Sequence, residues 1–256
     1  MAKSLEGIRI ILLRPREQSF DLQKDLESRS ARVILFPTIR IVPDFSGINQ
    51  QQLELKLKQY DFILFSSANA AMIFRQLLNK LSLKLENPRI YAIGGKTAQI
   101  AAEQGFTVDW VSSRAVMEAL VEELATEVVK GQKGLFPCSR LAAETAQTGL
   151  LSHGITLDRL EIYDNKPEYP PKQLLVSELE ITGPLFCFVL SPSSICNLAN
   201  LLSEKELQIA RNKVQFLSIG PVSSRAIESF CLHVAAEASP HNAEGMVTAL
   251  EELVGG

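Results

Sequence analysis

Short apolar runs alternate with amphipathic stretches along the whole of this 256-residue chain. A continuous apolar run is typical of a strand that is buried on both faces of a sheet. The stretch after Ser67, by contrast, places Ala70, Ile73, Phe74 and Leu77 at the spacing of one helix face. Repeated alternation of the two patterns predicts parallel sheets covered by helices on both faces, and hence an α/β fold.

The predicted elements follow one another without long gaps. Strands are expected at Ile8–Leu13, Val33–Phe36, Phe62–Phe65, Ile90–Ile93, Thr107–Val111, Gly134–Pro137, Leu185–Leu190, Val214–Ile219 and Leu232–Ala235. Helices are expected at Glu17–Ser28, Gln50–Lys58, after Ser67, at Lys96–Gln104, Val116–Val128 and Ala142–Ser152, between the last three strands, and at the end of the chain. Two extended segments, Thr38–Val42 and Asp158–Tyr163, interrupt this plan, and we predict that they pair with each other.

The chain repeats itself once. The repeat relates Ser66 to Ser191, Gly94 to Gly220 and Arg14 to Arg140, at offsets of 125, 126 and 126 positions. The segments therefore follow the order A, B, A′, B′, where A and A′ contain the arginines and B and B′ contain the Ser and Gly turns. Two similar α/β modules share this chain.

In each half, one apolar strand ends in a Ser-rich turn and a later strand ends in a Gly turn. Backbone N–H groups at such strand-to-helix turns bind anions, and ligands of open α/β sheets lie at the carboxyl ends of the strands. A purely structural interpretation is that Gly94 and Gly220 only permit tight turns. That interpretation explains each turn singly, whereas a ligand explains why both halves have both turns. We therefore predict an anionic ligand.

Composition and charge narrow the class of protein. Apolar residues make up 46% of the chain and charged residues 21%, so substantial cores can form. The net charge is −3, and no basic stripe indicates nucleic acid or an anionic membrane. The four cysteines form no C-x-x-C pair, and we expect Cys187 and Cys231 in apolar strands, which favours a reducing compartment. With neither a signal-peptide core nor a membrane-spanning run, a cytoplasmic protein is expected.

Common catalytic and cofactor motifs are missing. Gly95-Lys96-Thr97 resembles the end of a P-loop, but that motif needs a glycine where Ile90 stands. No G-x-G-x-x-G fingerprint follows a strand, and the three histidines lack metal-ligand spacing. The residues offer no nucleophile–base constellation. Tyr163 has two interpretations: a ring that anchors an interface, or a hydroxyl directed into a cleft between lobes.

A series of short motifs, taken in order, resembles the uroporphyrinogen-III synthase family. The motifs are Leu13-Arg14-Pro15, Phe36-Pro37-Thr38-Ile39-Arg40-Ile41, Asp61–Ala70, Ile93–Ala98, Glu161-Ile162-Tyr163, Leu190–Ser194, Ile219–Ser224 and Ala243–Met246. Each is weak alone, but their joint order and spacing along the whole chain are specific. Leu13, Ser66 and Ser223 stand where the family has Thr.

The resemblance implies two similar flavodoxin-like lobes, each a parallel sheet flanked by helices. In the family each lobe combines non-adjacent segments, A with B′ and B with A′, which agrees with the order of the repeat. It thus implies lobe 1 at residues 1–37 and 168–256, lobe 2 at 43–160, and a two-stranded extended linker at 38–42 and 161–167. Two thin linkers lead us to expect lobe motion on ligand binding.

The resemblance also implies an activity. Linear hydroxymethylbilane would be cyclised to uroporphyrinogen III, with loss of water and inversion of ring D, on the route to haem, sirohaem and cobalamin. That chemistry needs no metal or redox cofactor. Tyr163 matches the family's tyrosine and is the candidate to assist loss of the hydroxyl. The substrate's carboxylates are expected at Arg14, Ser66, Ser67, Asn69, Gly94, Lys96, Thr97, Arg140, Ser191, Ser193, Ser194, Gly220 and Ser223.

Few partners are expected from the resemblance. Hydroxymethylbilane synthase could hand over the substrate, and we expect a monomer that binds neither nucleic acid nor membrane. The main alternative is a two-lobed cytoplasmic small-molecule binding or sensor protein without catalysis, because it would share the lobes and the anion-binding turns. A nucleotide-dependent enzyme is the third candidate, and the missing glycine fingerprints weigh against it.

Overall fold

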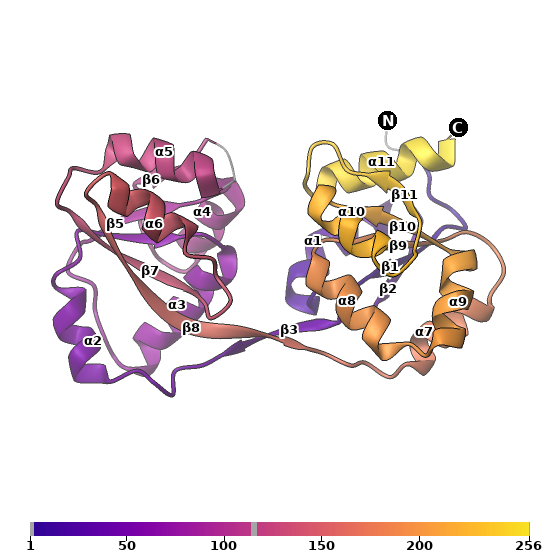
Figure 1. Ribbon diagram of the computed structural model, residues 1–256, viewed down its shortest axis with the longest axis horizontal. Coiled ribbons are helices and arrows are strands. Elements are labelled where there is room, and N and C mark those ends of the chain that lie inside the picture. Colours follow the sequence, from indigo (N-terminus) through magenta and orange to yellow (C-terminus); the bar gives the residue numbers. More distant parts are fainter. Residues whose placement is uncertain (1–2, 114–116, 256) are drawn as a thin grey trace. The chain divides into compact units, whose positions relative to one another are not determined.

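The computed structural model describes residues 3–113 and 117–255. The chain divides into two compact units: unit 1 is Met1–Arg40 with Lys166–Gly256, and unit 2 is Ile41–Asn165. Figure 1 shows that the indigo N-terminal segment and the orange and yellow C-terminal third together form unit 1. Segments that are far apart in the sequence therefore fold into one compact unit.

Unit 1 is built on a parallel five-stranded sheet with the order β2-β1-β9-β10-β11. Its strands are β1 (Arg9–Leu12), β2 (Arg32–Leu35), β9 (Leu185–Val189), β10 (Val214–Ser218) and β11 (Val234–Glu237). Its helices are α1 (Arg16–Ser28), α7 (Gln173–Glu180), α8 (Pro192–Leu201), α9 (Glu204–Lys213), α10 (Pro221–Glu228) and α11 (Ala243–Gly255). Renumbered in chain order, these strands follow 2-1-3-4-5, which is the flavodoxin-like arrangement.

Both faces of the unit 1 sheet are covered, and β9 shows why such strands are apolar without interruption. Leu185, Cys187 and Val189 lie in one core with side chains of α7, α8, α9 and α10. Phe186 and Phe188 lie in a second core with α1 and α11. Successive strand residues point to opposite faces, so a strand between two layers of helices is apolar at every position.

Unit 2 contains a six-stranded sheet with the order β3-β8-β7-β4-β5-β6. Its strands are β3 (Ile39–Pro43), β4 (Phe62–Phe65), β5 (Arg89–Ala92), β6 (Trp110–Val111), β7 (Lys133–Ser139) and β8 (Thr156–Pro167). Its helices are α2 (Gln50–Leu57), α3 (Ala68–Lys80), α4 (Gly94–Glu103), α5 (Met117–Glu127) and α6 (Thr145–Ser152). Ile63 and Phe65 pack with α2 and α3, whereas Phe62 and Leu64 pack with α5 and α6.

The two sheets have one architecture assembled from exchanged segments. In unit 2, β7 and β8 take the positions that β1 and β2 hold in unit 1, and β4, β5 and β6 take those of β9, β10 and β11. Segment A therefore pairs with B′, and B pairs with A′. The chain passes between the units within β3 and β8, which are neighbouring strands. The predicted α/β fold with two lobes and a two-stranded linker is confirmed.

Several details differ from the prediction. The helix α6 begins at Thr145 rather than Ala142, because a turn follows β7. The prediction did not specify α7 and α9; α9 buries only Leu207 and Ala210. Cys231 is not in a strand: it is exposed, with φ of 54°, in the connection before β11.

Two further points concern the helices. Val116, where one helix was expected to begin, lies outside the described residues. Within residues 3–113 and 117–255, no helix has the length and apolar character needed to cross a bilayer.

A substitution of Gly245, in the first turn of α11, would test how closely unit 1 is packed. A Cβ at this position would overlap the carbonyl oxygen of Pro240, which is backbone and cannot rotate away. We expect Gly245→Ala to lower the free energy of unfolding by about 1–3 kcal/mol, as overpacking does. Gly95→Ala is the matched control, because a Cβ there meets nothing within 4 Å. Urea denaturation measures both variants, and equal stability of the two would contradict the close contact at Gly245.

Candidate functional site

Ligands of open parallel sheets bind where neighbouring strands connect in opposite directions, at the carboxyl ends of those strands. In unit 1 this point lies between β1 and β9, and in unit 2 it lies between β4 and β7. The segments that follow these four strands contain Arg14, Ser191, Ser67 and Arg140, respectively. The topology of each sheet thus places predicted site residues at the edge where open parallel sheets commonly bind ligands.

The edge of unit 2 is organised by Ser67, the N-cap of α3. Its hydroxyl oxygen accepts a hydrogen bond from the N–H of Ala70 at 3.2 Å. The same oxygen lies 3.1 Å from the hydroxyl oxygen of Tyr163. Ser66 and Asn69 flank this cap and are half-buried. A polar cluster therefore stands at the start of a helix whose buried face anchors it in the core.

Tyr163 lies in β8, opposite Ser139 of β7. Its ring belongs to the core beneath α3, and only 8% of the residue is exposed. Burial raises the pKa of Tyr163 above its ordinary value, and the hydrogen bond with Ser67 opposes this shift only in part. The phenol therefore stays protonated at neutral pH and can donate a hydrogen bond.

The turn after β7 presents Arg140, which is exposed and forms an ion pair of 2.8 Å with Asp44. This turn is held by Arg159 of β8. Its guanidinium donates to the carbonyl oxygens of Ala142 at 2.6 Å and of Arg140 at 3.3 Å. Arg159 was not among the predicted site residues. The signal that could have identified it is a cation within an otherwise extended, partly apolar segment.

The Gly turn of unit 2 begins α4. Gly94 has φ of 72°, in the left-handed region that favours glycine. Its N–H donates to the hydroxyl of Ser112 at 3.2 Å, a partner that sequence reasoning missed. Lys96 is exposed and Thr97 is buried. The N–H of Gly94 is thus already paired, and Lys96 is the most accessible of the three predicted residues in this turn.

Arg14 follows β1 at the edge of unit 1 and is half-buried. Its Nε donates to Oε1 of Gln18 at 2.7 Å, and no carboxylate among the described residues pairs with it. Burial lowers the pKa of Arg14 from its ordinary value, because the charge is partly removed from water. A partly desolvated guanidinium without an acidic partner is suited to bind a carboxylate.

Ser191 holds the N-cap position of α8, the helix that follows β9, without a side-chain capping hydrogen bond. Its hydroxyl oxygen lies 3.4 Å from that of Ser193, and its carbonyl oxygen accepts from the hydroxyl of Ser194 at 2.7 Å. Ser194, Ser223 and Gly220 are buried, whereas Ser193 is exposed. Ser191 and Ser193 therefore have accessible hydroxyl groups at this edge, and the other three shape the turns.

The structure thus brings Tyr163 and Ser67 together in unit 2, with Ser66 and Asn69 close to Ser67 along the chain, and gives unit 1 a separate edge with Arg14. Over the described part of the chain, no group of three or more His, Cys, Asp or Glu side chains could hold a metal ion.

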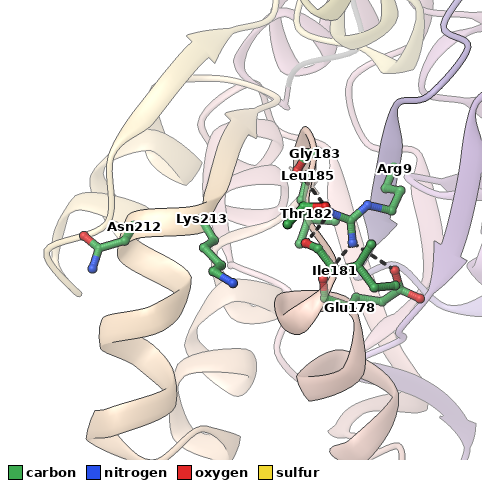
Figure 2. A pocket seen from close by; sticks show the side chains of 8 residues that line it. All are labelled: Arg9, Glu178, Ile181, Thr182, Gly183, Leu185, Asn212 and Lys213. Atoms are coloured by element: carbon green, nitrogen blue, oxygen red, sulfur yellow. Dashed lines mark hydrogen bonds and ion pairs between the residues drawn. The ribbon is translucent and has the colours of Figure 1, made fainter.

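The pocket in Figure 2 lies at a different place. It has a volume of about 290 Å³, and Arg9, Glu178, Gly183 and Lys213 are among its lining residues. Arg9 begins β1, so the pocket is at the amino edge of the sheet, opposite to Arg14. The Arg9 guanidinium binds the Glu178 carboxylate at 3.2 Å and the carbonyl oxygens of Glu178 and Gly183 at 2.6 and 3.1 Å. The N–H groups of Arg9 thus bind the end of α7. We therefore assign this pocket to the packing of unit 1 and not to a ligand site.

Comparison with known proteins establishes the family. The family model described as uroporphyrinogen-III synthase HemD matches residues 21–248. The chain belongs to the uroporphyrinogen-III synthase family. A protein named uroporphyrinogen-III synthase from Chlorobaculum parvum is 27% identical over 230 residues, which cover 88% of this chain and 90% of that protein. Another of that name, from Synechococcus elongatus, is 26% identical over 255 residues, which cover 97% of this chain and 96% of that protein.

Solved structures agree on the fold. The uroporphyrinogen-III synthetase of Helicobacter pylori aligns with a TM-score of 0.65 at 16% identity, over 96% of this chain and 99% of that one. A mutant uroporphyrinogen III synthase of Thermus thermophilus aligns with a TM-score of 0.58 at 14% identity, over 97% and 99%. At such identities the likeness concerns the fold alone. Membership of the uroporphyrinogen-III synthase family, however, does not favour the alternative of a sensor without catalysis.

In this uroporphyrinogen-III synthase family member, a substitution of Arg159 would test whether its hydrogen bonds stabilise the turn after β7. We expect Arg159→Met to speed amide hydrogen exchange in residues 140–142 about tenfold, because the turn loses hydrogen bonds to its carbonyl groups. Arg75→Met is the control: its Nε donates to the carbonyl oxygen of Gln104 at 2.7 Å, in a different turn of unit 2. Amide exchange, monitored by mass spectrometry, should rise in the turn at Gln104 in Arg75→Met and stay unchanged in residues 140–142 of that variant. Unchanged exchange after Arg159→Met would contradict this role.

Proposed function

We propose that this protein cyclises linear hydroxymethylbilane to uroporphyrinogen III, with loss of water and inversion of ring D. Family membership supports the reaction class. The observation that carries the proposal is the buried hydroxyl of Tyr163, 3.1 Å from the helix-capping hydroxyl of Ser67 at the carboxyl edge of unit 2. That edge is where a ligand of such a sheet binds.

The chemistry asks little of the protein beyond positioning and one hydrogen-bond donor. A pyrrole nitrogen of the substrate expels the hydroxyl of the hydroxymethyl group, which leaves an azafulvene. Tyr163 donates a hydrogen bond to the departing oxygen, which leaves as water once it has gained a proton. The substituted α-carbon of ring D then attacks this electrophilic carbon and forms a spiro intermediate. The bond from that α-carbon to the methylene of ring C breaks, and the free α-carbon of ring D attacks the released methylene and loses its proton, so that ring D is inverted. Holding a flexible chain in the reactive geometry supplies much of the rate enhancement.

Binding of a polycarboxylate has to rely on local donors, because the net charge of the protein is −3. Arg14 is the strongest of these donors in our proposal, since its guanidinium is half-buried and without an acidic partner in the described chain. The helix N-termini at Ser67 and Ser191 add backbone N–H groups and a favourable dipole. Arg140 contributes less, because Asp44 already neutralises it.

We propose further that the protein acts as a monomer in the cytoplasm, with lobes 1–37 plus 168–256 and 43–160 moving about the linkers 38–42 and 161–167. The four cysteines are all unpaired, which supports a reducing compartment. Hydroxymethylbilane closes spontaneously to the type I isomer, and this short lifetime favours hand-over by hydroxymethylbilane synthase.

A coupled assay tests the reaction. Hydroxymethylbilane is supplied with the protein, the product is oxidised, and the porphyrin isomers are separated. We expect the type III isomer in excess over the protein-free blank. Only the type I isomer, at the rate of the blank, would refute the proposed function.

The variant Tyr163→Phe tests the donor. It removes one hydroxyl group and leaves the buried ring in place. We expect kcat for the type III isomer to fall about ten- to hundredfold, with KM changed less than about twofold, because the donor acts on the leaving oxygen. The thermal midpoint should stay near that of the wild type. Wild-type turnover, with spontaneous closure subtracted, would remove Tyr163 from the mechanism.

The variant Arg14→Gln tests carboxylate binding. Loss of one charge-assisted hydrogen bond should raise KM on the order of tenfold, with a smaller effect on kcat. Arg140→Gln should raise KM less, because Arg140 is paired with Asp44. Equal effects of the two substitutions on KM would contradict the assignment of Arg14 as the main anchor.

A further inference from the structure

The Ser67 hydroxyl occupies a place that capping alone does not explain. Its oxygen is 3.2 Å from the N–H nitrogen of Ala70 and 3.1 Å from the Tyr163 hydroxyl oxygen. We infer that Ser67 is a positioning residue: it donates its proton to the oxygen of Tyr163, so that the proton of Tyr163 is free to point at the substrate. This inference rests on the proposed function and gives Ser67 a role other than binding a carboxylate.

The count of protons and lone pairs supports this direction of donation. A serine hydroxyl has one proton and two lone pairs, and one lone pair of Ser67 accepts from Ala70. Tyr163 also has one proton, and in the described chain its hydroxyl meets only Ser67. If Tyr163 hydrogen-bonds to the leaving oxygen, its proton is used there. The bond between the two hydroxyls can then persist only with Ser67 as donor.

The hydrogen bonds form a chain that begins at a helix terminus. The N–H of Ala70 donates to Ser67, Ser67 donates to Tyr163, and Tyr163 donates to the substrate. Each bond in such a chain polarises the next, and the positive end of the α3 dipole acts in the same direction. Both partners are fixed by packing, because Ala70 is fully buried and the Tyr163 ring lies in the core. The packing of α3 and β8 in the core therefore sets the distance between the hydroxyl oxygens of Ser67 and Tyr163.

The repeat provides a comparison within the molecule. Ser191 holds the N-cap position of α8 with φ −158° and ψ 150°, almost the values of Ser67, −156° and 154°. The Ser191 hydroxyl, however, lies 3.4 Å from the hydroxyl of Ser193 rather than beside a tyrosine. The same backbone conformation thus forms without a phenol partner, although the Ser191 side chain makes no capping hydrogen bond. The contact with Tyr163 is specific to unit 2, which places the hydrogen-bond chain there.

The test is a double-mutant cycle in the isomer assay. We expect Ser67→Ala to lower kcat about three- to tenfold, with KM within about twofold of the wild type. In the Tyr163→Phe background, Ser67→Ala should lower kcat less than about 1.5-fold, because the group it acts through is gone. Independent, multiplying losses in the double variant, or a loss seen mainly in KM, would overturn the inference.

Two further variants separate positioning from helix capping. Asn49→Ala removes the N-cap of α2, an exposed side chain of the same unit that accepts from Gln52 at 3.0 Å. It should lower the thermal midpoint about as much as Ser67→Ala, by about 2–4 °C, and leave kcat unchanged. Ser67→Thr keeps the hydroxyl and should restore most of kcat. A loss of kcat in Asn49→Ala, or a Ser67→Thr variant that regains stability without kcat, would overturn the inference.

Failure of this inference can be told apart from failure of the proposed function. If the wild type forms only the type I isomer, the proposed function is wrong. If the wild type forms the type III isomer and the cycle is additive, the reaction stands and Ser67 does not act through Tyr163.

Discussion

Parallel pairing between distant segments is the constraint on which this protein depends. Strand β1 pairs with β9, and β4 pairs with β7, across roughly two thirds of the chain in the first case. A parallel pair cannot be closed by a tight turn, and both faces of a parallel sheet have to be covered by helices. The interleaved order A, B, A′, B′ meets both of these requirements in each of the two units. It also creates the two points at which connections diverge and ligands bind.

The two units share their architecture and differ in chemistry. The arginines related by the repeat have opposite surroundings: Arg14 is half-buried without an acidic partner in the described chain, whereas Arg140 is exposed and paired with Asp44. The serines at the N-cap positions also differ: Ser67 caps α3 and meets a phenol, whereas Ser191 makes no capping hydrogen bond and meets another serine. A duplicated scaffold can thus divide anion binding and chemistry between its halves without a change of fold.

The opposite edges of the sheets are devoted to stability. In unit 1, Arg9 joins the end of α7 to β1 through carbonyl oxygens and the Glu178 carboxylate. In unit 2, Asp158 accepts from Tyr60 at 2.8 Å and pairs with Lys133 at 2.9 Å. The polar groups at these amino edges bind one another. This arrangement separates the residues that hold the fold from those available to a ligand.

Much of this protein could be predicted from its sequence. The α/β class, the repeat, the order of strands along the chain and the types of residue at the turns follow from local patterns, because periodicity and turn chemistry act over a few residues. The tertiary structure alone decided which hydroxyl meets which, that the Gly94 N–H is occupied by Ser112, and that Arg159 holds the turn of Arg140. These contacts join residues from 18 to 96 positions apart. Such distances are set by sheet register and core packing, which no local pattern encodes.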